Sequence, residues 1–282
     1  HFRYAAVYTQ YGCPYSCSYC TESITSVAYR PADSVLEEMR ILKRAGYREM
    51  HLGDASFGFP KPNAVRLLQG MVDGRLGFSW SCYTYPALAD REMLALMKAS
   101  GCHTVVIGID SANTDLLRKY GRRLSTDRLE RFLADCRALG IDVCGDFILG
   151  FDEDTEESIR QTVDLALRSQ LAYASINIAT PLFGSALREK AQHEHRLAER
   201  ANGFDTAGNS ILGNLTIDPE TLRRIRREAN RAFYLRPGYL WRRLRTVQGP
   251  QHFAIQALEA AGLMENYFRH LLGTSASPRP GE

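Results

Sequence analysis

Short apolar segments alternate with helical segments along residues 3–179 of the chain. The apolar segments carry Val, Ile, Tyr and Phe between turn residues, which favours strands, and the segments between them repeat apolar residues at helical spacing. Such alternation is typical of βαβ units, in which helices cover parallel strands. The sequence predicts strands at residues 3–10, 49–52, 78–83, 104–109, 143–149 and 175–179.

Six strands with intervening helices predict an α/β fold, a partial (β/α)6 barrel over residues 1–185. After Pro181 the alternation stops, and a C-terminal helical extension is predicted over residues 186–272. Residues 273–282 are rich in Ser, Pro and Gly and are predicted to be disordered. Barrels carry their chemistry at the carboxyl ends of the strands, so functional residues are expected just after each strand.

Two helix starts are predicted from residues that cap helix N-termini. Ser34, with Glu37 three residues later, has the form of a capping box. Asp154 and Glu157 are predicted to cap the helix that ends near residue 168. Further helices are predicted at residues 64–72, 90–99, 114–120, 126–139, 187–199, 219–235 and 251–272.

Three cysteines follow the first predicted strand at the spacing C-x₃-C-x₂-C: Cys13, Cys17 and Cys20. One short loop of this kind can bring three thiolates to three corners of an iron–sulfur cube. Ordinary electron-transfer clusters use four thiolates, so three would leave one iron open to another ligand. Catalytic zinc sites keep a position open for the same reason.

A zinc site and a disulfide cluster are the alternative explanations of the cysteine spacing. Zinc takes four N or S ligands, and the nearest further candidates, His51 and Cys82, are distant in sequence and have no partner at metal-binding spacing. A disulfide framework suits a short secreted chain, whereas this chain has 282 residues and shows no secretory leader. The spacing therefore favours an iron–sulfur cluster.

The cysteine motif resembles that of the radical S-adenosyl-L-methionine (radical SAM) superfamily. The resemblance implies a [4Fe-4S] cluster on Cys13, Cys17 and Cys20, with SAM chelating the open iron through its amino and carboxylate groups. It further implies that an electron from the cluster splits the sulfonium to give a 5′-deoxyadenosyl radical. Tyr19, the aromatic residue before the third cysteine, is then expected beside the adenine.

Segments after the second and fourth predicted strands resemble SAM-binding segments of the superfamily. Gly53 and Asp54 resemble the segment that binds the SAM amino group, in the form found in the cobalamin-associated branch but with one Asp missing. An ordinary βα turn is the alternative. Asp110 and Ser111 resemble a Gly-Ile-Glu-Ser segment that reaches the ribose or the methionine carboxylate, although Asp110 is one methylene shorter than Glu. Ser111 could instead only cap the next helix.

Two further residues are candidates for the site. Gly150, at the end of the fifth predicted strand, resembles the segment that packs beside the adenine. Cys82 lies in the third predicted strand, where a buried thiol could donate a hydrogen atom to a substrate radical, although free cysteine is also a common core residue. Cys102, Cys136 and Cys144 lack cluster spacing, which argues against a second cluster.

The resemblance covers residues 3–244 and implies a radical SAM enzyme of the cobalamin-associated branch, which contains C-methyltransferases and cyclases of biosynthesis. The expected substrate is a small molecule, and the expected electron donor is a flavodoxin or ferredoxin. That branch usually places a cobalamin-binding domain before the barrel, whereas the first predicted strand here begins at residue 3. Either that domain lies outside this segment, or the enzyme works without cobalamin and catalyses a rearrangement or oxidation.

Composition restricts the partners and the compartment. A formal net charge of +3 does not by itself indicate nucleic acid, and no apolar run approaches the ~18 residues of a membrane span. Clustered free cysteines fit a reducing compartment, so a cytoplasmic location is expected. Two rival functions are an RNA-modifying radical SAM enzyme, for which no added domain is visible, and a non-catalytic metal-binding module, which predicts a fourth protein ligand.

Overall fold

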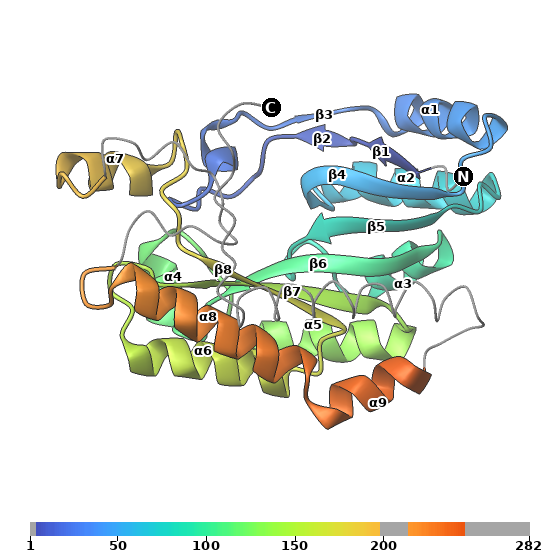
Figure 1. Ribbon diagram of the computed structural model, residues 1–282. Coiled ribbons are helices and arrows are strands. Elements are labelled where there is room, and N and C mark those ends of the chain that lie inside the picture. The colour runs from blue at the N-terminus through green and yellow to red at the C-terminus, as the bar shows by residue number, and fades with distance from the viewer. Residues whose placement is uncertain (1–3, 198–213, 246–282) are drawn as a thin grey trace, which may run out of the picture. The chain divides into compact units, whose positions relative to one another are not determined.

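The computed structural model describes residues 4–197 and 214–245, and six parallel strands form its main sheet (Figure 1). The strands lie in the order β1-β4-β5-β6-β7-β8, and every neighbouring pair is parallel. Each of the six predicted strands is present, which confirms the α/β fold. The bounds are β1 Tyr4–Val7, β4 Glu49–Phe57, β5 Ser79–Thr84, β6 Cys102–Asp110, β7 Asp142–Leu149 and β8 Tyr173–Ile178.

Helices follow the strands and supply the apolar cover of the sheet. Helix α1, for example, buries Val35, Leu36 and Met39, which recur at helical spacing on one side. Strands β1 and β8 form the two edges of the sheet and do not pair with each other, so the barrel is open. The helices of this part are α1 Ala32–Arg44, α2 Lys61–Asp73, α3 Arg91–Ala99, α4 Thr114–Lys119, α5 Thr126–Leu139 and α6 Glu156–Arg168.

Side chains along the central strands alternate between buried and half-exposed positions. In β4, Met50 and Leu52 are fully buried, whereas His51 and Gly53 are half-exposed. Strands β7 and β8 show the same alternation. Successive strand residues point to opposite faces, so one face of the sheet is sealed by helices and the other stays partly open. This open face is available for a ligand.

The cysteine loop is closed at its base by a small antiparallel ribbon. Strands β2 (Gln10–Tyr11) and β3 (Ala28–Tyr29) pair with each other, and the 3-10 helix η1 (Thr21–Ile24) lies between them. The predicted strand at residues 3–10 is therefore split into β1 and β2. Gly12 turns the chain at φ +71°, and a Cβ there would lie 2.7 Å from the carbonyl oxygen of Ser26.

Both predicted helix caps are wrong in detail. Helix α1 begins at Ala32 after Pro31, and the Ala32 N–H donates to the side chain of Asn63 at 3.0 Å, so Ser34 lies inside the first turn. Helix α6 is capped by a Thr155–Ser158 capping box instead of Asp154 and Glu157. The first N–H groups of each helix are thus bound by other residues than those predicted: by Asn63 of α2 at the start of α1, and by Thr155 at the start of α6.

The Asp154 carboxylate, which was predicted to cap α6, holds the turn after β7. It accepts hydrogen bonds from the backbone N–H groups of Gly150 and Phe151, both at 3.0 Å, and from the Ser158 hydroxyl. Gly150 adopts φ +84°, a backbone angle that residues other than glycine rarely adopt. The turn is therefore fixed by its own hydrogen bonds and by backbone geometry.

The C-terminal part contains the helices α7 (Ala186–His193), α8 (Pro219–Tyr234) and α9 (Pro237–Arg245). The chain divides into two compact units, His1–Phe233 and Tyr234–Glu282, so α7 and most of α8 belong to the unit that holds the sheet. The predicted boundary at residue 185 stays a prediction. The predicted helix at 251–272 and the tail at 273–282 lie outside the described residues. No helix in the described ranges is long and apolar enough to cross a membrane.

Replacing Gly150 with Ala should lower the free energy of unfolding by about 1–3 kcal/mol, because the positive φ is unfavourable for Ala and the new Cβ would lie 2.7 Å from Cδ1 of Leu222 in α8. Gly238 in α9 is the matched control, since a Cβ there meets nothing within 4 Å. Gly238→Ala should leave stability unchanged or slightly higher. Urea denaturation gives the unfolding free energy of both variants. An equal loss in Gly150→Ala and Gly238→Ala would contradict the role assigned to the positive φ and the close contact at Gly150.

Candidate functional site

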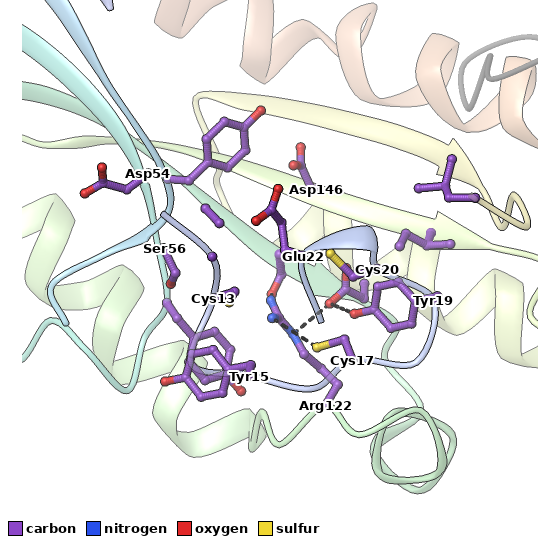
Figure 2. Close-up of a pocket in the computed structure, with 18 of the residues that line it drawn as sticks. Cys13, Tyr15, Cys17, Tyr19, Cys20, Glu22, Asp54, Ser56, Arg122 and Asp146 are labelled. Atoms are coloured by element: carbon purple, nitrogen blue, oxygen red, sulfur yellow. Dashed lines mark hydrogen bonds and ion pairs between the residues drawn. The ribbon is translucent and has the colours of Figure 1, made fainter. Parts of the chain in front are cut away.

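A cavity of about 490 Å³ opens on the half-exposed face of the sheet, towards the carboxyl ends of its strands. Its walls come from the cysteine loop, from strands β4 to β8 and from the loop after α4 (Figure 2). Thr84 and Asp110 line it from the last residues of β5 and β6. The cavity thus lies at the edge of the sheet where the sequence placed the chemistry.

The three cysteines of the loop line this cavity together and are all free. Cys17 is buried, whereas Cys13 and Cys20 are half-buried. Burial raises the pKa of Cys13 and of Cys20, and the charges of neighbouring thiols raise both further. Three thiolates at one place therefore need added positive charge, which the irons of a cluster would supply.

The thiols are not arranged around a single ion. Within residues 4–197 and 214–245, no three His, Cys, Asp or Glu side chains converge where one metal ion could sit. The ligands of a cube bind different irons and so lie farther apart than the ligands of a lone zinc. The donor set, three free thiols on one cavity wall, fits the implied [4Fe-4S] cluster.

Arg122 enters the cavity from the loop after α4 and was not identified from the sequence. Its Nε lies 2.8 Å from Oδ2 of Asp110, and its Nη2 donates to the carbonyl oxygen of Gly108 at 2.5 Å. The guanidinium also stacks over the Tyr85 ring at 4.4 Å from the centroid, and Nη1 lies 3.9 Å from Sγ of Cys17. A single arginine in a loop has no periodicity or ligand spacing that could have revealed it.

The segment before Arg122 braces the cysteine loop through the backbone. The Ser18 N–H donates to the carbonyl oxygen of Tyr120 at 3.0 Å. Gly121 adopts φ +76°, and a Cβ there would lie 2.6 Å from the carbonyl oxygen of Ser16. Two segments about a hundred residues apart in sequence are thus held against each other, which brings the guanidinium to Cys17.

Tyr19 and Asp110 were predicted as separate SAM contacts, and the structure joins them. The Tyr19 hydroxyl donates to Oδ2 of Asp110 at 2.9 Å, and its ring packs edge-on against Phe151. Burial, reinforced by the Asp110 carboxylate, raises the pKa of Tyr19 far above its usual value, so the phenol is the donor. Asp110 adopts φ +63°, rare for a residue with a side chain, where the pairing of β6 with β7 shifts register.

Asp54 and Gly53 line the cavity but are also committed to the fold. The Asp54 carboxylate, 1% exposed, accepts from the N–H of Thr9 at 2.6 Å, from the Thr9 hydroxyl and from the N–H of Gln10 at 3.1 Å. It therefore ties the turn between β1 and β2 to β4. A Cβ on Gly53 would lie 2.7 Å from the Tyr8 ring. Their predicted role in binding SAM stays a prediction.

Ser111 and Gly150 do not line the cavity. The Ser111 hydroxyl accepts from the N–H of Asn113 at 3.1 Å and lies 3.2 Å from the Thr162 hydroxyl. Asn113, and not Ser111, caps helix α4. Ser111 thus serves as a link between β6 and α6, and its predicted contact with SAM has no support from this placement.

Cys82, the predicted hydrogen donor, faces away from the cavity. It is fully buried in β5, and its thiol lies beside those of Cys102 and Cys136 among the core residues. Burial and the hydrogen bond with Cys102 raise its pKa well above the usual value. This placement matches the alternative that Cys82 is a core residue.

Asp146 is a second cavity residue that the sequence did not reveal (Figure 2). It lies in β7, where its register partners are Gly108 in β6 and Ser175 in β8. Burial raises the pKa of Asp146 to about 6, with a further rise from the charge of Asp110, while the Ser175 hydroxyl and the charge of Arg122 lower it. Its signal in the sequence, an Asp inside an apolar strand, does not distinguish a ligand-binding carboxylate from a structural one.

The Asp110–Arg122 ion pair should be strongly coupled, because both side chains are almost buried, at 6% and 13% exposure. Arg122→Met leaves the Asp110 carboxylate without its cation and should cost about 3 kcal/mol or more of unfolding free energy. Adding Asp110→Asn should recover part of that loss. Urea denaturation of the two single variants and the double variant gives the coupling.

The exposed pair Arg118–Asp115 is the control for this cycle. Its coupling should stay below about 0.5 kcal/mol, because solvent screens it. Equal coupling in the two pairs would show that burial does not strengthen the inner one.

Asp146 should make stability fall as the pH rises from about 4 to about 6. The unfolded carboxyl releases its proton near pH ~3.9, whereas the folded one holds it to about 6, so the folded state binds more protons in that interval. Asp146→Asn should therefore raise the unfolding free energy by about 2 kcal/mol near neutral pH and leave it unchanged near pH ~3.5. Urea denaturation at both values tests this; a gain of the same size at both would contradict it.

Comparison with known proteins gives one family match. Residues 7–166, more than half of the 282, match the sequence model of the radical SAM superfamily. An uncharacterized methyltransferase of Pyrococcus horikoshii is 28% identical over 84% of this chain and 52% of its own length. Bacteriochlorophyllide d C-12(1)-methyltransferase of Chlorobaculum tepidum is 31% identical over 69% of this chain and 42% of its own length.

A solved structure shares the fold. The radical SAM methyltransferase TsrM of Kitasatospora setae, with cobalamin and a [4Fe-4S] cluster bound, superposes with a TM-score of 0.64 over 81% of this chain and 46% of its own, at 23% identity. The chain spans about half the length of the relatives it matches. The family match at residues 7–166 contains the cysteine loop and strands β4 to β7.

Proposed function

The chain belongs to the radical SAM superfamily, and from this premise we propose that it reductively cleaves SAM in order to methylate or cyclise a small molecule. As members of this superfamily are enzymes that use a [4Fe-4S] cluster and SAM, the same cofactors are assigned to this chain. Cleavage of SAM and the particular reaction are the proposal. The observation that carries it is that Cys13, Cys17 and Cys20 line one cavity together with Arg122, Asp110 and Tyr19.

The three thiols would hold the cluster on the cavity wall. When bound, the cluster and SAM supply a one-electron reduction of the sulfonium that yields a carbon radical able to take hydrogen from a C–H bond. The protein contributes placement and exclusion of water. Arg122 places a fixed positive charge beside the Cys17 sulfur. Tyr19 and Asp110 fix the loop that carries Cys20.

The enzyme is related to methyltransferases, and the proposal extends this to a cobalamin-associated reaction. Its supports are the bacteriochlorophyllide methyltransferase relative and the fold shared with TsrM, whose structure contains cobalamin. The alternative is a rearrangement or oxidation without cobalamin. We also propose a flavodoxin or ferredoxin as electron donor and a cytoplasmic location, since the seven cysteines, all free, fit a reducing compartment.

Anaerobic reconstitution with iron and sulfide should load about four iron atoms per chain. Addition of reductant and SAM should then release 5′-deoxyadenosine. Cys17→Ala should lose both the bound iron and the release of 5′-deoxyadenosine, because two thiolates cannot hold three corners of the cube. Cys144→Ala is the matched control, since Cys144 does not line the cavity, and it should keep both. An iron-loaded wild-type protein that leaves SAM intact would refute the proposed cleavage.

The same incubation distinguishes the two reaction types by mass balance. Transfer of the SAM methyl group must leave S-adenosylhomocysteine, whereas a rearrangement or oxidation leaves only 5′-deoxyadenosine and methionine. Formation of S-adenosylhomocysteine that depends on added cobalamin would support the cobalamin-associated reaction. 5′-Deoxyadenosine alone, with cobalamin and candidate substrates present, would rule out methyl transfer and leave cyclisation, rearrangement or oxidation.

A further inference from the structure

The carboxylates that line the cavity outnumber its cations. Among the described lining residues, Glu22, Asp54, Asp110 and Asp146 are acidic and Arg122 is the one basic side chain. Arg122 is paired with Asp110, and Asp54 is held by backbone and hydroxyl donors. Glu22 lies in η1, two residues after Cys20. On the sheet side of the cavity, Asp54 and Asp146 thus have no ion pair within the described residues, and Asp146 lacks the backbone N–H donors that hold Asp54.

The side chains that contact Asp146 are neutral, and the charges of Asp110 and Arg122 act on it from farther away. Ser175 is its hydrogen-bond partner on β8, and the Asn177 side-chain amide donates to the Ser175 hydroxyl at 3.0 Å. On β5, Tyr83 is close enough for the Asp146 charge to raise the pKa of its phenol, after the larger effect of burial. A half-buried carboxylate with only neutral donors costs free energy that an ion pair would recover.

Asp146 lies deeper in the cavity than the cysteine loop. It shares a face of β7 with Ile148, which also lines the cavity, and lies two residues farther from the carboxyl end of the strand. That step corresponds to roughly 7 Å. Gly108, its register partner on β6, has no side chain, and the Arg122 guanidinium occupies the position that a Cβ there would take. Tyr83, 41% exposed, and Asn177 complete the wall at this depth.

We propose that Asp146 is the anionic anchor of a substrate subsite and binds a protonated amine carried by the small-molecule substrate. This inference rests on the proposed function, because it takes the cavity to hold a small-molecule substrate. Asp146 accepts hydrogen bonds from the ammonium group, and the Tyr83 ring offers its face to the cation or to an apolar part of the substrate. The anchored substrate then lies below the cysteine loop, with its body towards Cys17 and Cys20.

SAM itself carries an ammonium group, so the same chemistry has two sources. The depth of Asp146 in β7 favours the substrate, since the cysteine loop that defines the cofactor end lies at the rim. Binding measurements with separate probes distinguish the two sources.

The test compares 2-phenylethylamine with 2-phenylethanol, which share an aromatic body and differ in charge. Dissociation constants are measured by calorimetry near neutral pH on the reconstituted wild-type protein and on Asp146→Asn. Wild type should bind the amine about tenfold or more tightly than the alcohol, as expected for a charge-assisted hydrogen bond. Asp146→Asn should remove that preference and leave alcohol binding unchanged. Glu22→Gln, which changes another carboxylate of the cavity, should keep the preference.

Three results would overturn the proposal: no preference for the amine in wild type, a preference that survives in Asp146→Asn, or a preference lost in Glu22→Gln instead. Thermal unfolding is the second readout, because an unpaired carboxylate gives a melting temperature for Asp146→Asn at or above that of wild type. A large fall in melting temperature would show that Asp146 is a structural residue and would also overturn it.

Equilibrium dialysis with radiolabelled SAM separates the two ammonium sources. Asp146→Asn should bind SAM within about twofold of wild type, whereas a tenfold loss would assign Asp146 to the cofactor and overturn the substrate subsite. Release of 5′-deoxyadenosine is followed in the same preparations. Amine selectivity without SAM cleavage would contradict the proposed reaction and support the subsite. SAM cleavage without amine selectivity would support the reaction and contradict the subsite.

Discussion

The ion pair between Asp110 and Arg122 connects the parts from which the cavity is built. Asp110 ends a central strand, Arg122 follows the next helix, and their 2.8 Å contact is almost fully buried. The same guanidinium reaches Cys17 and Tyr85, and the same carboxylate accepts from Tyr19. One charge pair therefore fixes the cysteine loop relative to the sheet. A buried pair of this kind holds its geometry because loss of either partner leaves a charge uncompensated.

The open face of the sheet provides the room for chemistry. Helices seal one face with fully buried residues such as Met50 and Leu52, while the alternate residues of the same strands remain half-exposed. Because β1 and β8 do not pair, the sheet does not close around this face. The result is a cavity whose rim carries thiols and whose depth carries the Asp146 carboxylate. The thiols and the Asp146 carboxylate thus lie at different levels along the direction of the strands.

Much of the fold could be predicted, because strand and helix periodicity is a local property. All six strands were found in order, and the three cysteines line one cavity as their spacing implied. The errors concern residues whose partners are distant in sequence. Asn63 displaced Ser34 at the start of α1, and Asp154 turned to Gly150 and Phe151. The SAM-binding role of Asp54 and the hydrogen-donor role of Cys82 stay predictions, but their observed contacts also come from distant segments: the turn after β1 holds Asp54, and Cys82 lies beside two other thiols in the core.

The sequence by itself determined the α/β alternation and the trio of thiols, since both are encoded in residue spacing along a short stretch. Only the tertiary structure decided which charges accompany those thiols. Arg122 and Asp146 lie in segments without any motif, and their place in the cavity is evident only from their neighbours on other strands and loops. The physical reason is that a parallel sheet brings residues from far along the chain to one edge, where electrostatic interactions depend on distance in space and not on order in sequence.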